Sequence, residues 1–386
     1  MRARVPTYRV SRSLLPCLIY GLICVQILMG PILVATGAGA AVFGKDDRVA
    51  VPARLDSVTQ RLGLLFNNQT RTVCSAFCVA HNMIATAAHC IGRGQLKPVR
   101  YQDFSFARNY GRNSETAKIE GLATNSAAQN ILTGDFRLRV RPPIDAAHDW
   151  AIIKLQGRGC PAGGLPVRGL SNEDLTAEAD AGRIFQVSYH RDWVRWRPAY
   201  SKPCVIGRDF EGAKWSSIAP DFLNSEQMIL HTCDTGGASS GSPMLLDTPE
   251  GPVVVGINVG TYVQSKIVTQ NGKVTLRQKS ETVANTAVSA QVFAAKIDVL
   301  RNASILTSGR PMRELQERLS VLGYYAGPID SAYGPAVKTA IEAYEKAMRQ
   351  PVTGLATKPL LMRMTEDALR SNGEVTPSSA FQIPVR

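Results

Sequence analysis

Histidine is scarce in this sequence, with five residues among 386. Protein metal sites gather several histidine, cysteine or carboxylate ligands at short spacing, and no such clustering occurs around His81, His148, His190 or His231. We therefore expect no metal ion and no cofactor. The sequence also lacks a nucleic-acid-binding motif. Its excess of 44 basic over 31 acidic residues therefore predicts a solubilising surface charge and no nucleic-acid partner.

Acidic residues are absent from the first 12 positions, which carry four arginines. Residues 14–35 are mostly apolar, and the small residues Ala38, Gly39 and Ala40 follow. This order is typical of a secretory signal peptide, so we predict a leader over residues 1–40 that is cleaved near Ala40. The apolar run is long for a signal peptide, so an uncleaved membrane anchor through residues 14–35 is the alternative.

Two of the eight cysteines lie in this leader, which leaves an even number in the exported chain. An even number of cysteines in an exported protein predicts disulfides, although sequence alone does not determine the pairing. The six remaining residues are Cys74, Cys78, Cys90, Cys160, Cys204 and Cys233. The length and the 45% of hydrophobic residues allow two or three domains with packed cores.

Residues 43–302 contain short runs rich in Val and Ile, separated by clusters of Gly, Pro and Asn. This alternation predicts antiparallel β-structure in closed sheets. The Asn271-Gly272 pair predicts a hairpin turn. Residues 289–300 are the exception, because their apolar spacing predicts a helix with Ser289 as its N-cap.

A run of small residues from Cys233 to Pro243 contains Ser240, which we interpret as a nucleophile. A serine hydroxyl reacts poorly at neutral pH unless a base takes its proton and N–H donors stabilise the oxyanion. His89 follows one apolar run and can supply the base, and Asp149 opens another and can orient it. Each motif alone also occurs in ordinary turns and strand ends. Their order along the chain, His then Asp then Ser, is one of the known orders of a catalytic triad.

The stretches 86–90 (Thr-Ala-Ala-His-Cys) and 240–243 (Ser-Gly-Ser-Pro) resemble the trypsin-like serine proteases of the chymotrypsin fold. The Ser-Gly-Ser-Pro sequence is most similar to the bacterial glutamyl-endopeptidase branch, and so is the stretch from Gly44 to Arg48. The resemblance covers about residues 43–302. It implies an all-β double barrel, with two six-stranded barrels and the triad at their junction.

The resemblance implies that Ser240 is the nucleophile, His89 the general base and Asp149 the residue that orients the imidazole. It also implies an oxyanion hole formed by the backbone N–H groups of Ala238 and Ser240. Ala238 stands where the family usually has glycine, and its Cβ narrows the allowed backbone angles. Ser239 stands where many animal members carry an aspartate that pairs with a new amino terminus, so we do not expect that activation switch. Ser239 is the alternative nucleophile.

The resemblance also indicates residues that would contact the substrate. Asp234 occupies the position of the carboxylate that binds Lys or Arg side chains in trypsin-like members, with Thr235 beside it. Alternatively, Asp234 points away and caps a loop. Asn258 replaces the histidine used by the glutamyl-endopeptidase branch, so glutamate specificity is not expected. Val259 and Gly260 are expected to offer backbone groups to an extended substrate.

The family also suggests one of the disulfides. It implies a disulfide between Cys74 and Cys90, which would close the loop that carries His89. For the other four cysteines we expect Cys204–Cys233 and Cys78–Cys160.

The composition changes after a linker at residues 303–310, and leucines then recur at helical spacing. Residues 311–366 predict three short helices around one apolar cluster. This part resembles the peptidoglycan-binding domain found beside cell-wall hydrolases, which implies peptidoglycan as a partner; a generic three-helix adaptor is the alternative. The stretches that carry the resemblance include Leu322-Gly323-Tyr324-Tyr325, Ile329-Asp330 and Tyr333-Gly334. Residues 367–386 are polar and are predicted to be a disordered tail.

These observations together predict an exported serine endopeptidase, periplasmic or secreted and associated with the cell envelope. Its substrate would be a protein or peptide, and the carboxy-terminal module would hold the enzyme near the wall at a raised local concentration. One alternative is a protease-fold binding protein in which Ala238 has ended catalysis. The other is a hydrolase that cuts the peptide cross-links of the wall.

Overall fold

The computed structural model describes residues 41–92, 99–111, 114–134, 142–270, 273–307 and 309–371. The predicted leader, its alternative as a membrane anchor, and most of the predicted tail lie outside these ranges. Within them, none of the helices has the length and hydropathy needed to span a bilayer.

The first sheet has seven strands in the order β6-β5-β2-β3-β4-β8-β7, and every neighbouring pair is antiparallel. Its strands are β2 (Leu62–Asn67), β3 (Thr72–Ala80), β4 (Met83–Thr86), β5 (Phe104–Arg108), β6 (Thr116–Ala117), β7 (Ile131–Thr133) and β8 (Ala151–Lys154). Strands β4 and β8 are neighbours, with Thr86 opposite Ala151. The residues that follow β4 therefore lie at the same end of the sheet as those that precede β8.

The second sheet also has seven antiparallel strands, in the order β1-β10-β9-β12-β13-β14-β11. Its strands are β1 (Val49–Ala50), β9 (Ile184–Tyr189), β10 (Pro198–Ser201), β11 (Met228–His231), β12 (Pro243–Leu246), β13 (Val253–Gln270) and β14 (Lys273–Ser289). Strand β1 precedes the first sheet in the chain, yet it pairs with β10, with Val49 opposite Tyr200. The amino-terminal segment thus belongs to the second sheet.

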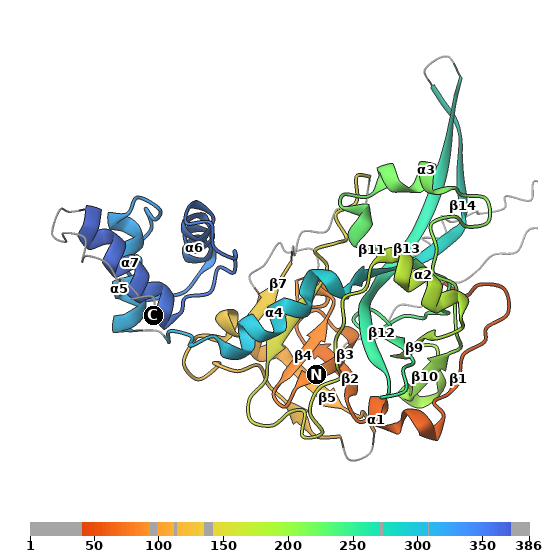
Figure 1. Ribbon diagram of the computed structural model, residues 1–386, viewed down its shortest axis with the longest axis horizontal. Helices are drawn as coiled ribbons and strands as arrows, with labels where there is room; N and C mark the ends of the chain where they lie inside the picture. Colours follow the sequence, from red (N-terminus) through yellow and green to blue (C-terminus); the bar gives the residue numbers. More distant parts are fainter. Residues whose placement is uncertain are drawn as a thin grey trace, which may run out of the picture. The chain divides into compact units, whose positions relative to one another are not determined.

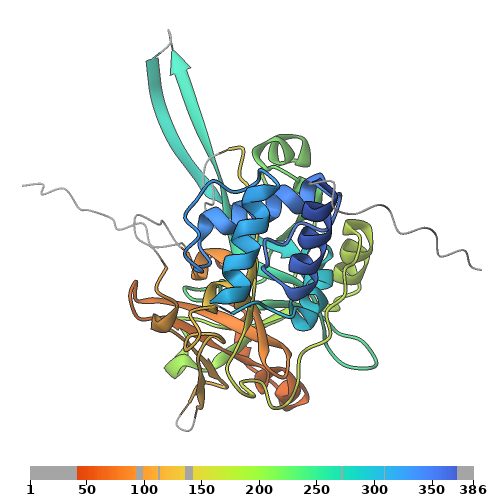
Figure 2. The same cartoon turned by 90° about the vertical axis from the view of Figure 1, so that its left-hand side faces the viewer.

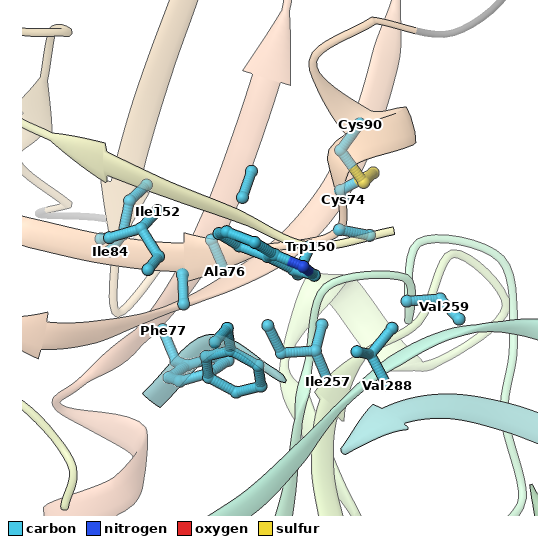
Figure 3. Close-up of a cluster of buried hydrophobic side chains, with 14 of the residues drawn as sticks. Cys74, Ala76, Phe77, Ile84, Cys90, Trp150, Ile152, Ile257, Val259 and Val288 are labelled. Carbon is cyan, nitrogen blue, oxygen red and sulfur yellow. A yellow bond between two sulfur atoms is a disulfide. The ribbon is translucent and has the colours of Figure 1, made fainter. Parts of the chain in front are cut away.

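Figure 1 shows the arrangement of the two sheets, and both bury side chains in one continuous apolar core. Figure 3 shows Phe77 and Ile152 of the first sheet in the same cluster as Ile257 and Val288 of the second. An antiparallel sheet can pack one face on a core, and the short Val- and Ile-rich strands of both sheets supply the apolar side chains of that face. The fold is all-β and of the chymotrypsin type, as predicted, although each sheet has seven strands and not the expected six.

Four short helices accompany the sheets: α1 (Asp56–Thr59), α2 (Asn172–Asp180), α3 (Trp215–Ile218) and α4 (Ala290–Asn302). Helix α4 lies where the sequence predicts a helix, and the Ser289 hydroxyl caps it by accepting a hydrogen bond from the Gln291 N–H at 3.3 Å. Strands β13 and β14 continue as a two-stranded ribbon beyond the rest of their sheet (Figures 1 and 2). Gln270 pairs with Lys273, and the predicted turn residues between them, Asn271 and Gly272, lie outside the described ranges.

The carboxy-terminal part contains the three predicted helices, α5 (Arg310–Val321), α6 (Pro335–Ala347) and α7 (Lys358–Ser371). Their apolar faces form a separate core whose fully buried members include Leu315, Ile341 and Tyr344. Helix α7 continues five residues past the predicted boundary at 366, so the start of the expected disordered tail is wrong. The Tyr344 hydroxyl donates to Asp367 at 2.6 Å, and this contact ties the extra turn to the core.

Three disulfides join Cys74 to Cys90, Cys78 to Cys160 and Cys204 to Cys233. These are the pairs that the sequence analysis expects. The first bridges β3 to the turn after β4, and it belongs to the same buried cluster as Trp150 (Figure 3). The second links residues 82 positions apart in the chain, whereas the first links residues 16 apart.

We predict that removing the long-range disulfide costs more stability than removing the short one. The loop-entropy model gives about 4.5 kcal/mol for a loop the size of the Cys78–Cys160 loop and about 3 kcal/mol for one the size of the Cys74–Cys90 loop. Both pairs are buried, so the two double alanine variants are matched in lost volume. Urea unfolding monitored by fluorescence measures the difference, and a larger loss for the Cys74/Cys90 variant would contradict the prediction.

Candidate active site

His89 and Asp149 are brought together by the pairing of β4 with β8. His89 lies in the one-turn 3-10 helix Ala88–Cys90 that follows β4, and Asp149 immediately precedes Trp150 and β8. One oxygen of Asp149 accepts the His89 backbone N–H at 2.8 Å, and the other lies 2.6 Å from His89 Nδ1. The carboxylate accepts both bonds, so Nδ1 is the donor, and in the neutral imidazole Nε2 then keeps its lone pair.

Burial differs across this pair in a way that suits general base catalysis. Asp149 is 1% exposed, whereas the His89 side chain retains 14% exposure. The Cys74–Cys90 disulfide anchors the turn that carries His89. The neighbouring His148 makes its own contact with Asp145 at 2.7 Å and takes no part in the His89–Asp149 pair.

The turn around Ser240 packs directly on β3 of the first sheet. Ser75 of β3 donates its N–H to the carbonyl oxygens of Ala238 and Ser240, both at 2.9 Å. The Ser240 carbonyl oxygen also lies 4.0 Å from the sulfur of Cys90, the residue next to His89. Gly241 has φ +85°, and a Cβ there would lie 2.2 Å from the Ser75 carbonyl oxygen. Only glycine permits this close approach.

The two candidate nucleophiles differ in what surrounds them. Ser239 is 5% exposed, and its hydroxyl accepts a hydrogen bond from the buried Asn258 amide at 3.2 Å. Ser240 is half-buried. This difference favours Ser240 over Ser239 as the residue that meets a substrate.

The predicted oxyanion donors are shaped by an unusual backbone conformation. Ala238 has φ +81°, a left-handed conformation that costs a non-glycine residue about 1 kcal/mol or more. The Gly237 carbonyl oxygen accepts the Arg191 N–H at 2.5 Å. In a trans peptide the carbonyl and the following N–H point in opposite directions, so the Ala238 N–H faces away from Arg191. Within the described ranges, neither this N–H nor that of Ser240 donates a hydrogen bond.

The interpretation of Asp234 as the carboxylate that binds a Lys or Arg side chain of the substrate is wrong. Asp234 is 3% exposed, and its two oxygens accept the backbone N–H groups of Phe43 at 2.8 Å and Asp47 at 2.9 Å. Thr235 is equally buried, and its N–H donates to the Ala41 carbonyl oxygen at 2.9 Å. The amino-terminal segment covers both residues, so the alternative of a loop cap is correct for Asp234.

Asn258 also has a structural role and does not face a substrate. It is 1% exposed, and its amide nitrogen donates to the carbonyl and the hydroxyl oxygens of Ser239, both at 3.2 Å. Its Oδ1 lies 3.1 Å from His231 Nε2. The amide oxygen can only accept, so His231 donates from Nε2. Asn258 thus links Ser239 of the Ser240 turn to the buried His231 of β11.

Val259 and Gly260 lie in a part of β13 that keeps one edge available. Strand β12 pairs with β13 only as far as Ile257, and a register shift interrupts the β14 pairing between Asn258 and Gly260. No described strand lies beside the β12-facing edge at these two residues. An extended peptide can add to such an edge through backbone hydrogen bonds. That Val259 and Gly260 bind a substrate in this way stays a prediction.

Two groups of residues have the spacing of metal ligands within the described part of the chain. They are Cys74, His89 and Cys90, and Cys204, His231 and Cys233. In each group the two cysteines are joined in a disulfide. Thiolates, which are the metal-binding form of cysteine, are therefore not present there.

Sequence reasoning missed a third set of site residues: the segment Ala41–Arg48 and the loop His190–Trp193. Arg48 is buried and pairs with Asp46 and Asp192. The only signal in the sequence was the resemblance of residues 44–48 to a mature amino terminus, which indicates that the segment is retained but not what it contacts.

Two antiparallel sheets that share one core are typical of the chymotrypsin fold, and the turn that carries His89 lies near the Ser240 turn. The family comparisons agree: residues 74–257 match the trypsin-like peptidase domain, and residues 308–364 match the peptidoglycan-binding domain. The chain therefore contains a trypsin-like peptidase domain followed by a peptidoglycan-binding domain.

Among solved structures, a Glu endopeptidase in complex with MPD is 17% identical to this chain. The match covers 67% of this chain and 98% of that chain, with a TM-score of 0.45. The search of curated proteins found no match.

We predict that two buried histidines make the fold labile to acid. Burial lowers the pKa of His231 to about 4, and burial followed by the charge of Arg48 lowers that of His190 to about 3. The unfolded chain binds these protons near pH 6.5, so stability is fully present above that pH. It is lost as the pH falls from 6.5 toward 4, by up to about 1.4 kcal/mol per pH unit for each histidine.

Urea unfolding between pH 7 and pH 4 measures this dependence. His231→Gln keeps a donor for Asn258 but cannot titrate, so its stability should fall less steeply than that of the wild type. His81, which is exposed, provides the matched control as His81→Gln. Identical slopes for wild type and His231→Gln would contradict the prediction.

Proposed function

We propose that the protein is an exported serine endopeptidase that uses His89, Asp149 and Ser240. The observation that carries this proposal is the two-point contact between Asp149 and His89 beside the Ser240 turn. It leaves Nε2 of His89 as the proton acceptor. The free N–H groups of Ala238 and Ser240 supply the donors that an oxyanion needs.

In the proposed reaction, the Ser240 hydroxyl gives its proton to Nε2 of His89 as its oxygen attacks the scissile carbonyl. The N–H groups of Ala238 and Ser240 stabilise the oxyanion, and Asp149 stabilises the imidazolium. His89 then passes the proton to the leaving amine as the C–N bond breaks. A water molecule, deprotonated by His89, hydrolyses the resulting ester and restores Ser240.

The alternative of a catalytically impaired binding protein rests on Ala238. Its φ of +81° means that alanine here adopts a conformation that glycine adopts easily. The orientation of its N–H is supported by the Arg191 contact to the preceding carbonyl. The replacement therefore adds strain without removing the donor, which favours an active enzyme.

We predict that Ser240→Ala lowers kcat by about 10⁶-fold, because the covalent intermediate cannot form. Asp149→Asn should lower kcat by about 10⁴-fold, because the amide favours the wrong histidine tautomer. Hydrolysis of a peptide library by the purified protein, together with labelling by a fluorophosphonate probe, measures both effects.

Ser239→Ala is the matched control for Ser240→Ala, because it removes a hydroxyl from the adjacent residue. It should keep labelling within about tenfold of the wild type. Labelling of Ser240→Ala at the wild-type rate would refute the assignment of the nucleophile, and a wild-type protein inert to the probe and to all peptides would refute the enzyme.

We further propose that the leader exports the chain and that the helical domain holds it at peptidoglycan. The family match over residues 308–364 supports the ligand, and the three disulfides suit an oxidising compartment. The tyrosines of this domain are engaged in its packing: Tyr325 donates to the Pro328 carbonyl oxygen, and Tyr333 to that of Gly354. Sugar binding would then use other groups or the faces of these rings.

We predict that the full chain carrying Ser240→Ala sediments with purified peptidoglycan sacculi. Deleting residues 309–371, which contain the separate helical core, should abolish sedimentation while the otherwise wild-type deletion variant still reacts with the fluorophosphonate probe. Equal sedimentation of both chains would contradict the tether. Release of soluble fragments from sacculi by the wild type would favour the cross-link hydrolase over an endopeptidase acting on proteins.

A further inference from the structure

Arg48 is the most deeply buried cation in the described part of the chain, with 7% of its surface exposed. It lies in the segment Ala41–Arg48, which precedes β1 and runs along the second sheet. A buried guanidinium is costly unless its donors are satisfied. Its partners therefore indicate what this position is built to hold.

Two carboxylates bind the guanidinium at once. Asp46 accepts from Nε at 2.9 Å and from Nη2 at 2.7 Å, and Asp192 accepts from Nη1 at 3.2 Å and from Nη2 at 2.8 Å. The Trp193 ring lies beneath the guanidinium, 5.7 Å from Cζ to the ring centroid. Such two-pronged contacts fix direction as well as distance. Arg48 therefore fixes the loop His190–Trp193 relative to the amino-terminal segment.

That loop in turn holds the backbone that presents the oxyanion donors. The Gly236 N–H donates to Nδ1 of His190 at 2.9 Å, and the Arg191 N–H donates to the Gly237 carbonyl oxygen at 2.5 Å. The Arg48–Asp192 pair also lies against Gly236, where a Cβ would come within 2.1 Å of an Asp192 oxygen. The direction of the Ala238 N–H therefore depends on the position of this loop.

The same segment also holds the start of the turn. The Phe43 and Asp47 N–H groups bind the Asp234 carboxylate, and the Thr235 N–H donates to the Ala41 carbonyl oxygen. Residues 234 and 235 are thus held directly, and residues 236 and 237 are held through Arg48 and Asp192. One segment restrains four consecutive residues before the strained Ala238.

We propose that Ala41–Arg48 is a strap that sets the oxyanion hole, with Arg48 as its positioning residue. Ser239 has no charge with which to anchor the turn, and the Arg48–Asp192 pair supplies a charged anchor from outside it. When the pair is broken, the Gly237–Ala238 peptide loses the restraint that keeps its N–H toward the substrate, and Ala238 relaxes from its left-handed conformation. This inference rests on the proposed function for its kinetic consequence but not for its structural one.

The kinetic test compares Arg48→Met with Arg54→Met. Methionine keeps much of the buried length of Arg48, and the stranded carboxylates of Asp46 and Asp192 are 42% and 47% exposed, so water can solvate them. Removing an oxyanion donor costs about 10²- to 10³-fold in kcat. Arg48→Met should lower kcat and the rate of fluorophosphonate labelling by that factor, with KM changed less than about threefold. Arg48→Lys should recover part of the loss.

Arg54 provides the control, because it lies just beyond the segment Ala41–Arg48 and pairs with Asp247 at 3.0 Å, away from the loop. Arg54→Met should leave kcat and labelling unchanged. Labelling of Arg48→Met at the wild-type rate, or a loss equal to that of Arg54→Met, would overturn the strap. If Arg48→Met does not fold, Asp192→Asn takes its place, because it breaks the charge pair from the other side. Asp192→Asn should lower kcat and the labelling rate by a smaller factor.

Amide hydrogen exchange separates the strap from the enzyme activity. In Arg48→Met, but not in Arg54→Met, exchange should accelerate in residues 190–193 and 234–240. If the wild type fails to react with the probe, the proposed function fails, and the exchange comparison still decides the strap. Unchanged exchange in both segments would overturn it, whatever the kinetics.

Discussion

Ser75 makes the hydrogen bonds across the junction of the two sheets on which the geometry of the site depends. It is fully buried in β3, its N–H binds two carbonyl oxygens of the Ser240 turn, and its hydroxyl donates to Ala238 at 3.0 Å. The same hydroxyl accepts the Tyr189 N–H of β9 at 3.1 Å. One residue of the first sheet therefore binds both the Ser240 turn and β9 of the second sheet. A buried donor left unpaired here would cost about 1–3 kcal/mol, which makes any other seating of the turn unfavourable.

Three sets of contacts hold the Ser240 turn, and each restrains a different movement of it. Ser75 fixes its position on β3 of the first sheet. Asn258 supports it from beneath by binding the carbonyl and hydroxyl of Ser239. The loop at 190–193 fixes the rotation of the peptide before Ala238. A left-handed alanine persists only where its surroundings leave it no alternative, and these three contacts together provide that constraint.

The sequence predicted the elements of the site better than it predicted their surroundings. His89 and Asp149 could be inferred because each is adjacent to an apolar strand, and β4 and β8 pair as neighbours. The helix at α4 and the three carboxy-terminal helices follow from apolar spacing and caps that act within a few residues. Asp234 and Asn258 were interpreted wrongly because the contacts that bury them are not local in the sequence. What covers Asp234 comes from Phe43 and Asp47, about 190 positions earlier in the chain, and no local pattern records a contact of that range.

The position of the amino-terminal segment links export to the site in the proposed enzyme. A leader removed near Ala40 leaves Ala41 to Arg48 in place, and Ala41 then still binds Thr235. Processing a few residues further along would remove the N–H groups that satisfy Asp234 and would leave a buried carboxylate without partners. Such a charge is costly to bury unpaired, so the turn would open to solvate it. The buried Asp234 carboxylate therefore needs the N–H groups of the segment Ala41–Arg48. The sequence indicates Asp234 as a substrate-binding group, whereas in the structure it anchors the strap.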